Sequence, residues 1–285
     1  MANTRASSKT VLKYDNYHFF FEQGDSVFVA TLVSKIAGSL TDIEHFFSYR
    51  PQSVVTIILT RSRTEYETYA SRGVPEWSQA VAFTREKLII IKIETAEELK
   101  RSPEILLHEL VHILVAERFP GVRLPVWLNE GIAQYLSGYK LSLDDRITIA
   151  NALSVKKIMP LSEIDSLLDF SPLKARLAYL QSLAAVQFFI NEHGVDALQQ
   201  LIENFACLRS PNEAFSAAAG YDFIDFEIFW YEDLRSKYRW LILLNIDHLI
   251  WLIMGVLAIM AIIFVHFRNK RVIRSWEDEI PLNGE

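Results

Sequence analysis

Three residues of the stretch HELVH, residues 108–112, have the types and spacing that bind a metal ion and activate water. His108 and His112 are four positions apart, so an α-helix places both imidazoles on one face, one turn apart. Two neutral imidazoles in that arrangement can bind one zinc ion from the same side. Glu109 points about 100° round the helix from His108, which suits a general base better than a third ligand. The pattern therefore predicts zinc-assisted hydrolysis.

The neighbours of this motif indicate that its helix is largely buried. The flanking segments EILL and ILVA are apolar, and unpaired polar groups in a buried helix cost about 1–3 kcal/mol each. Zinc would satisfy the two histidines and the glutamate together. The alternative is a helix without metal, in which the histidines find other partners and the glutamate is solvated.

A catalytic zinc ion usually keeps three protein ligands and one open position, so a third ligand is needed. Glu130 lies 18 positions beyond His112, in LPVWLNEGIAQY. The intervening ERFPGVRLP contains Pro and Gly and must end the first helix. VWLNEGIAQYL then has the spacing of a second helix. This helix–loop–helix can bring Glu130 back beside the two histidines.

HELVH followed by WLNEG resembles the gluzincin zinc metallopeptidases, in particular the peptidase MA-like family. The resemblance covers roughly residues 14–236, with AYLQS, NEHG and NEAF as further matching segments. It implies an α+β fold with a gluzincin-like N-terminal lobe, a small mixed sheet plus the active-site helix, and an all-helical C-terminal lobe. It also implies that one edge strand of the sheet pairs with an extended substrate; WSQAVAFT is the candidate.

The same resemblance implies roles for individual residues. His108, His112 and Glu130 would hold one zinc ion per chain, and Glu109 would be the general base. A donor for the developing oxyanion is often a Tyr or His of the second lobe; Tyr179 is the first candidate, Tyr135 the second and His193 the third. Asn129 and Gln134 are candidates for orienting the imidazoles, although thermolysin-like enzymes carry Asp where this chain has Gln134.

Composition narrows the class of protein. The 285 residues carry a net charge of −6 without a basic block in the main body, so no nucleic-acid partner is expected. Cys207 is the single cysteine, which excludes a disulfide or a cysteine-based zinc site within one chain.

An unbroken apolar run, LIWLIMGVLAIMAIIFV at residues 249–265, predicts a membrane span, which needs about 20 residues. The alternative, a buried core helix, is disfavoured because nothing after residue 267 could pack over it. The N-terminal stretch lacks the apolar core of a signal peptide. Basic residues number three before the run and four after it, which leans toward an extracytoplasmic catalytic domain but leaves the orientation open.

Apolar periodicity predicts strands at YHFFFEQ, PQSVVTIILT, WSQAVAFT and KLIIIKI. A helix is expected after each of the first two strands, and the last two strands are joined near Arg85 and Glu86. Residues beyond 139 have helical spacing, punctuated by Gly and Pro. The expected divisions are a flexible N-terminus (1–13), the N-terminal lobe (14–138), a helical lobe (139–238), a transmembrane helix (241–267) and a charged tail (268–285).

These observations favour a membrane-anchored zinc metallopeptidase, with peptides or proteins as substrates and the lipid bilayer as a partner. The absence of an exopeptidase motif favours endopeptidase action. An alternative from another class is a catalytically inactive metallopeptidase-like module that binds or senses at a membrane. A third hypothesis is a non-peptidase zinc hydrolase on the same scaffold.

Overall fold

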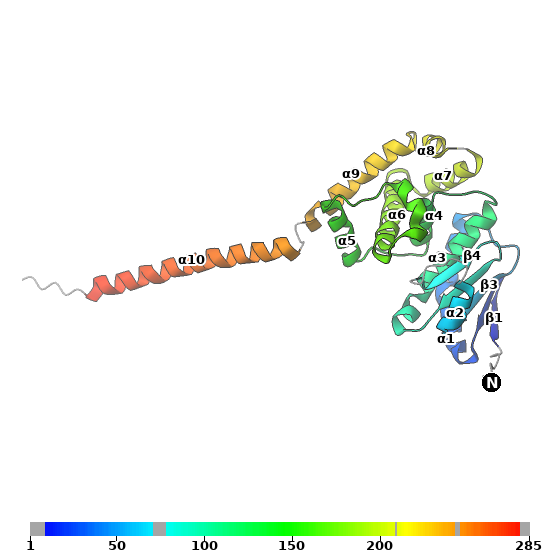
Figure 1. Ribbon diagram of the computed structural model, residues 1–285, viewed down its shortest axis with the longest axis horizontal. Coiled ribbons are helices and arrows are strands. Elements are labelled where there is room, and N and C mark those ends of the chain that lie inside the picture. The colour runs from blue at the N-terminus through cyan, green and yellow to red at the C-terminus, as the bar shows by residue number, and fades with distance from the viewer. Residues whose placement is uncertain (1–8, 71–77, 209, 243–245, 280–285) are drawn as a thin grey trace, which may run out of the picture.

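The computed structural model describes residues 9–70, 78–208, 210–242 and 246–279, which form two lobes and one long helix (Figure 1). The first lobe contains a sheet and three helices: β1 (Thr10–Tyr14), β2 (Tyr17–Phe21), α1 (Ser26–Phe46), β3 (Val55–Thr60), α2 (Arg63–Ala70), β4 (Ala80–Phe83), β5 (Leu88–Lys92) and α3 (Ala96–Arg118). The elements that follow are helical: α4 (Val126–Leu136), which lies between the two lobes, and, in the second lobe, α5 (Leu143–Ser154), the 3-10 segment η2 (Leu161–Asp169), α6 (Pro172–His193), α7 (Val195–Cys207), α8 (Pro211–Ala219) and α9 (Phe223–Ile242). The long helix is α10 (Ile246–Glu279).

The sheet has the order β1-β2-β3-β5-β4, so β4 is one of its edges. The three central strands, β2, β3 and β5, are parallel, and β1 and β4 run antiparallel to their neighbours. Alternate residues of β2 and β3 are buried, which is the period-2 pattern of a sheet packed on a core. The predicted strands and the small mixed sheet are therefore present, and the candidate edge strand is an edge.

The N-terminal strand corrects one expectation. Residues 1–13 were expected to be flexible, but β1 begins at Thr10 and pairs antiparallel with β2. The sequence TVLKY alternates in burial along this strand. Asp15 adopts φ 48°, a left-handed conformation that Asp tolerates and that tight hairpins use. Residues 1–8 of the predicted segment lie outside the described residues.

Aromatic packing holds the helical lobe together. Trp127 of α4, Phe215 of α8 and Phe226 of α9 form one buried cluster, with ring centroids 5.7 Å apart for Trp127–Phe226 and 4.8 Å apart for Phe215–Phe226. Since α4 also packs against α3 and α6, it joins the two lobes. The lobe boundary expected at residues 138 and 139 stays a prediction.

Among the residues that the structure describes, two helical segments are long and apolar enough to cross a membrane, Gln23–Phe46 and Ile250–Arg271. The first packs against the sheet through α1 and belongs to the core. The second is fully exposed and is a candidate for a single membrane span. Of the span predicted at 241–267, residues 243–245 lie outside the described residues. The tail predicted at 268–285 is helical as far as Glu279, since no Gly or Pro interrupts it before Pro281.

Candidate metal centre

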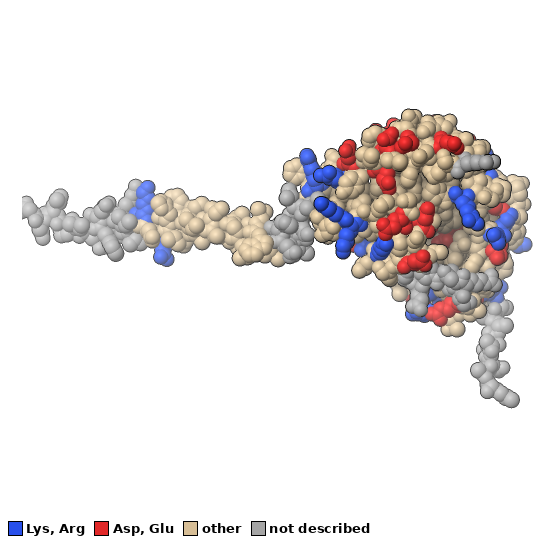
Figure 2. Space-filling model, turned by 45° about the horizontal axis from the view of Figure 1, so that its top comes forward, with Lys and Arg blue, Asp and Glu red and all other residues tan. Residues whose placement is uncertain are grey.

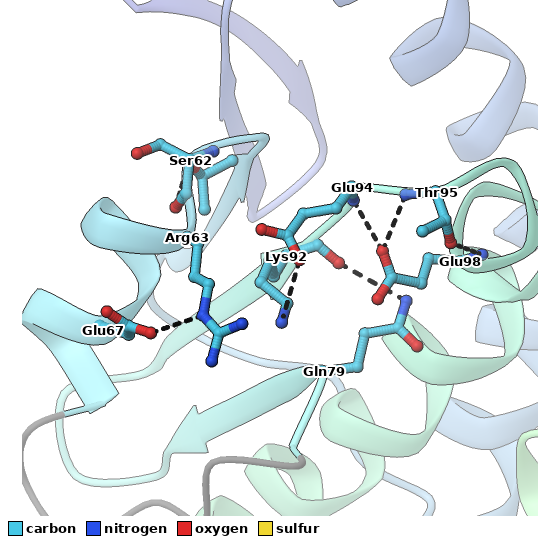
Figure 3. Close-up of polar contacts among 9 residues, drawn as sticks. Ser62, Arg63, Glu67, Gln79, Lys92, Glu94, Thr95 and Glu98 are labelled. Atoms are coloured by element: carbon cyan, nitrogen blue, oxygen red, sulfur yellow. Dashed lines mark hydrogen bonds and ion pairs between the residues drawn. The ribbon is translucent and has the colours of Figure 1, made fainter.

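The helix that carries HELVH is anchored to the edge of the sheet at its first turn (Figure 3). Thr95 accepts a hydrogen bond from the Glu98 backbone N–H, and the Glu98 carboxylate accepts from the backbone N–H of Thr95, a capping box. The Glu98 carboxylate also accepts from the Glu94 N–H at 2.7 Å. Gln79, just before β4, pairs through its backbone with Lys92 of β5. The start of α3 is therefore fixed relative to β4.

A proline inside α3 is accommodated by its neighbour. Pro103 has no N–H, so the Leu99 carbonyl loses its usual helical donor. The Ser102 hydroxyl, which is fully buried, donates to that carbonyl at 2.8 Å. Farther along, Leu106, Leu110 and Leu114 are buried in the core. The helix thus continues through HELVH with its apolar face packed.

The three predicted ligands converge on one point. The Nε2 atoms of His108 and His112 are 3.2 Å apart, and Oε2 of Glu130 lies 3.2 Å from the first and 3.6 Å from the second. Donor atoms that bind zinc at about 2.0–2.2 Å in tetrahedral geometry lie about 3.3–3.6 Å from one another. The buried Oε2 of Glu130 has no hydrogen-bond donor among the described residues. These residues fit a zinc ion by distance and donor type, and they form a group able to hold a metal ion.

The electrostatics of this cluster favour a cation. Burial raises the pKa of the Glu130 carboxyl, but the two histidines outweigh burial and hold that pKa well below its ordinary value. Burial lowers the pKa of His112, yet the Glu130 carboxylate, with smaller contributions from Glu109 and Asn129, raises it above its ordinary value. The carboxylates therefore draw positive charge to the point between the ligand atoms.

Gly131 allows the second helix to reach the first, and its role was not predicted from the sequence. A Cβ atom at this position would lie 2.4 Å from the Ser182 carbonyl oxygen and 2.6 Å from Cγ2 of Val186, both on α6. Only glycine permits α4 and α6 to approach this closely. Because Glu130 is the preceding residue, this close packing determines where its carboxylate lies. The glycine of the WLNEG pattern was visible in the sequence, but the steric reason for it depends on the position of α6.

Glu109 lies beside the edge strand. The backbone N–H of Ala82, in β4, donates to its carboxylate. Burial raises the pKa of the Glu109 carboxyl; His108 and His112 lower it, and Glu130 raises it further. A buried carboxylate next to two imidazoles can accept a proton and pass it on.

Tyr179 of α6 lies next to the cluster of His108, His112 and Glu130. Its ring centroid is 6.5 Å from that of His108. Burial, and then the charges of Glu130 and Glu109, raise the pKa of its phenol above the ordinary value. The Gln134 side chain donates to the Tyr179 carbonyl at 2.9 Å. Gln134, expected to orient an imidazole, therefore contacts the backbone of the tyrosine instead.

The other predicted residues lie in different places. Tyr135 lines a separate hollow with Ser39 of α1 and Val195 of α7. His193 contacts the Tyr221 hydroxyl at 2.6 Å. Asn129 contributes to the raised pKa of His112, although Nδ1 of His112 has no hydrogen-bond partner among the described residues. The structure thus brings Tyr179, but neither Tyr135 nor His193, to the cluster of His108, His112 and Glu130.

A cleft of about 710 Å³ opens beside the cluster, between β4, α3 and the helical lobe. At one end it is lined by Ser78, Gln79 and Ala80 at the edge strand. Its remaining lining includes Glu97, Arg101, Glu104, His108, Glu109, Tyr139, Lys140, Ser142, Asp145, Arg176 and Tyr179. Glu97 and His108 are eleven residues apart on α3, so this side is about 16 Å long, which matches about five residues of extended chain.

Comparison with known proteins agrees with this geometry. No curated protein matches the chain at a significant level. The family model described as the Peptidase MA superfamily matches residues 40–236, more than half of the chain, including both helices of the metal centre. The chain therefore belongs to the Peptidase MA superfamily and is a metallopeptidase-like protein.

Proposed function

We propose that this protein is a membrane-anchored zinc metallopeptidase that cleaves peptide bonds inside a polypeptide. The observation that carries the proposal is the convergence of His108 Nε2, His112 Nε2 and Glu130 Oε2, 3.2–3.6 Å apart, beside Glu109 and at the side of a cleft. A binding module has no need of a general base next to its metal ligands.

His108, His112 and Glu130 would hold one zinc ion, as their distances support. Zinc, when bound, supplies a Lewis acid that polarises the peptide carbonyl and makes water acidic enough to lose a proton near neutral pH. Glu109 takes that proton on its carboxylate. Because burial raises its pKa, Glu109 holds the proton long enough to return it to the leaving nitrogen.

Tyr179 is the proposed donor to the carbonyl oxygen as negative charge develops on it. Because its pKa is raised above the ordinary value of 10, the hydroxyl stays protonated at neutral pH. Its neighbour Gln134 fixes the backbone from which it projects. A donor aimed in advance at the developing charge contributes about 3–4 kcal/mol of barrier lowering.

The substrate would bind as an extra strand on β4. Gln79 accepts from the Lys92 N–H, so the alternate residues Ala80 and Ala82 turn their backbone groups away from β5. Ala82 already donates to Glu109, so the same edge positions both substrate and base. The length of the cleft along α3 suits a polypeptide that continues past the cleaved bond, as in endopeptidase action. The candidate span within α10 would hold the protein at the membrane.

The test uses the full chain, purified in detergent, with zinc content measured by atomic spectroscopy and cleavage followed with dye-labelled casein. We expect about one zinc per chain and cleavage for the wild type. Glu109→Gln should keep the zinc and reduce the cleavage rate by at least ~10³-fold, which is comparable to the loss of a general base. Glu130→Ala should lose both. Zinc in the wild type without cleavage of casein or of a peptide library would favour the inactive binding module.

A further inference from the structure

The link between the helical lobe and the candidate span is short. Helix α9 ends at Ile242 and α10 begins at Ile246, and four Cα steps reach at most about 14 Å. The candidate span starts four residues later, at Ile250. Those four helical residues add about 1.5 Å each, so the end of α9 lies within about 20 Å of the start of the span.

Helix α5 packs against α9 and lies beside its C-terminal end, next to the start of α10 (Figure 1). Arg146 of α5 is close enough to Tyr238 for its charge to act on the phenol of that residue. The first residue of α5, Leu143, is 66% exposed, and Trp240 of α9 is 65% exposed. Large apolar side chains in open water next to a membrane span are typical of an interfacial contact.

Basic side chains lie on or directly after the same two helices as these apolar ones. Figure 2 shows Lys and Arg gathered on the side of the body next to the start of α10. We define this area, the α5–α9 surface, by its exposed residues: Leu143, Arg146, Val155, Lys156, Lys157, Arg235, Lys237, Arg239 and Trp240. Within the described residues, no ion pair uses Arg146, Lys156, Lys157, Arg235 or Arg239. Two nearby acidic side chains form ion pairs: Asp233 with Lys237, and Asp144 with Arg176.

The start of α5 also lines the cleft. Ser142 and Asp145 line the cleft together with Arg176. Asp145 accepts from Arg176 at 2.7 Å, which ties the start of α5 to the start of α6. Leu143 lies between two cleft-lining residues, Ser142 and Asp145, yet projects into solvent. The cleft therefore borders the α5–α9 surface at the start of α5.

We infer that the α5–α9 surface lies on the anionic headgroups of the bilayer, so that the end of the cleft at Ser142 and Asp145 opens at the membrane. This inference rests on the membrane anchoring that is part of the proposed function, and it adds the class of substrate. The substrate class would be polypeptide segments within a few residues of the bilayer. Lysine and arginine side chains next to a span attract anionic lipids electrostatically, and Leu143 and Trp240 can insert at the interface.

The test measures the depth of three single-cysteine probes in the full chain, reconstituted in phosphatidylcholine vesicles with ~30% phosphatidylglycerol, an anionic fraction chosen to give a substantial surface charge. Cys207→Ser removes the native thiol. Leu143→Cys reports on the surface, Ile259→Cys on the span, and Val27→Cys, 81% exposed on α1, is the matched aqueous control. Each cysteine carries an NBD fluorophore, and lipid-attached nitroxides serve as quenchers.

We expect the probe at 259 to be quenched as in hydrocarbon, the probe at 143 to be quenched as in the headgroup layer, and the probe at 27 to stay unquenched. A probe at 143 as unquenched as that at 27, with 259 in the bilayer, would overturn the inference and leave the anchoring intact. An unquenched probe at 259 would reject the anchoring itself, and the inference with it.

A charge-reversal pair tests the lipid chemistry. Lys156→Glu with Lys157→Glu should reduce quenching at 143 at least two-fold, and so should vesicles of phosphatidylcholine alone. The matched control is Lys13→Glu with Lys35→Glu, which changes the net charge equally at exposed positions of the first lobe and should have no effect. Equal quenching at 143 in anionic and neutral vesicles would reject the headgroup contact.

The substrate class is tested with casein carrying a palmitoyl chain, compared with the same casein without it, in these vesicles. Wild-type protein should cleave the acylated form at least five-fold faster, and Lys156→Glu with Lys157→Glu should reduce this preference. Cleavage of both forms at equal rates would refute the class of substrate, whereas cleavage of neither would count against the proposed peptidase activity.

Discussion

Replacement of Gly131 by alanine should weaken the metal centre although the side chain touches no ligand. The added Cβ would lie 2.4 Å from the Ser182 carbonyl oxygen and 2.6 Å from Cγ2 of Val186. Ordinary contacts begin near 3.4 Å, so α4 must move by about 1 Å, because a backbone carbonyl on a buried helix cannot turn aside. Overpacking of this kind costs about 1–3 kcal/mol or more, against a gain of about 1 kcal/mol in helix propensity.

The matched control is Gly38→Ala in α1, a helical glycine with no atom within 4 Å of its added Cβ. It receives the propensity gain without the clash. We therefore expect Gly38→Ala to raise the apparent unfolding midpoint by about 2–4 °C, using the slope for larger domains. Gly131→Ala has a net cost of up to about 2 kcal/mol and should lower the midpoint by up to about 8 °C on the same scale.

The assay follows helical circular dichroism of the full chain in detergent at one fixed scan rate, because unfolding of such a protein is often irreversible. Zinc affinity is measured by competition with a chelator. Since α4 carries Glu130, a shift of about 1 Å should weaken zinc binding at least ten-fold. If Gly131→Ala were as stable as Gly38→Ala and bound zinc like the wild type, the close packing of α4 on α6 would be refuted.

Three further predictions concern the site and its surroundings. Tyr179→Phe should lower kcat by about 10²–10³-fold, the loss seen for an oxyanion donor, with zinc content and KM nearly unchanged. Tyr135→Phe is the control, because Tyr135 lines another hollow, and it should keep full activity. Equal effects of the two substitutions would reject Tyr179 as the donor. Removal of zinc by a chelator should lower the unfolding midpoint of the wild type, and zinc at 100 times its Kd should restore about 2.7 kcal/mol of unfolding free energy. The midpoint of Glu130→Ala should not respond to zinc. A response equal to that of the wild type would contradict the proposed ligands. Burial raises the pKa of Asp145, but Arg176, Ser142 and Tyr139 outweigh it and lower that pKa from 3.8 to about 2. Because the folded pKa is depressed, this stabilisation is complete above pH 3.8 and is lost as pH falls toward 2. Asp145→Asn should therefore be less stable at neutral pH and show a flatter loss of stability between pH 4 and pH 2 in equilibrium unfolding; parallel curves for variant and wild type would reject this coupling.

Much of the metal centre was predictable because its geometry is local. Residues spaced as His108 and His112 share one helix face on any α-helix. The helix break between the two histidines and Glu130 follows from Pro120, Gly121 and Pro125. The convergence of the three ligand atoms matches that expectation. The β-branched and aromatic runs likewise predicted four of the strands, because the alternation of side chains between the two faces of a strand depends on the local sequence alone.

Features that depend on which way a helix faces were not predictable. Tyr135 and Tyr179 were comparable candidates by sequence, and only the packing of α4 on α6 turns one away and brings the other to His108. The need for glycine at position 131 arises from a carbonyl 51 residues away in the chain. The hydrogen bond from Ala82 to Glu109 depends on the register of β4.

The sequence by itself therefore determined the chemistry available to this protein: two imidazoles, two carboxylates, the helices that carry them, and an apolar segment long enough to cross a membrane. Tertiary structure alone decided which tyrosine lies beside them, how closely α4 approaches α6, and that the start of α5, which packs against α9, lines the cleft. The physical reason is that helix formation depends on neighbours a few residues away, whereas the facing of a side chain is set by long-range packing of buried surfaces.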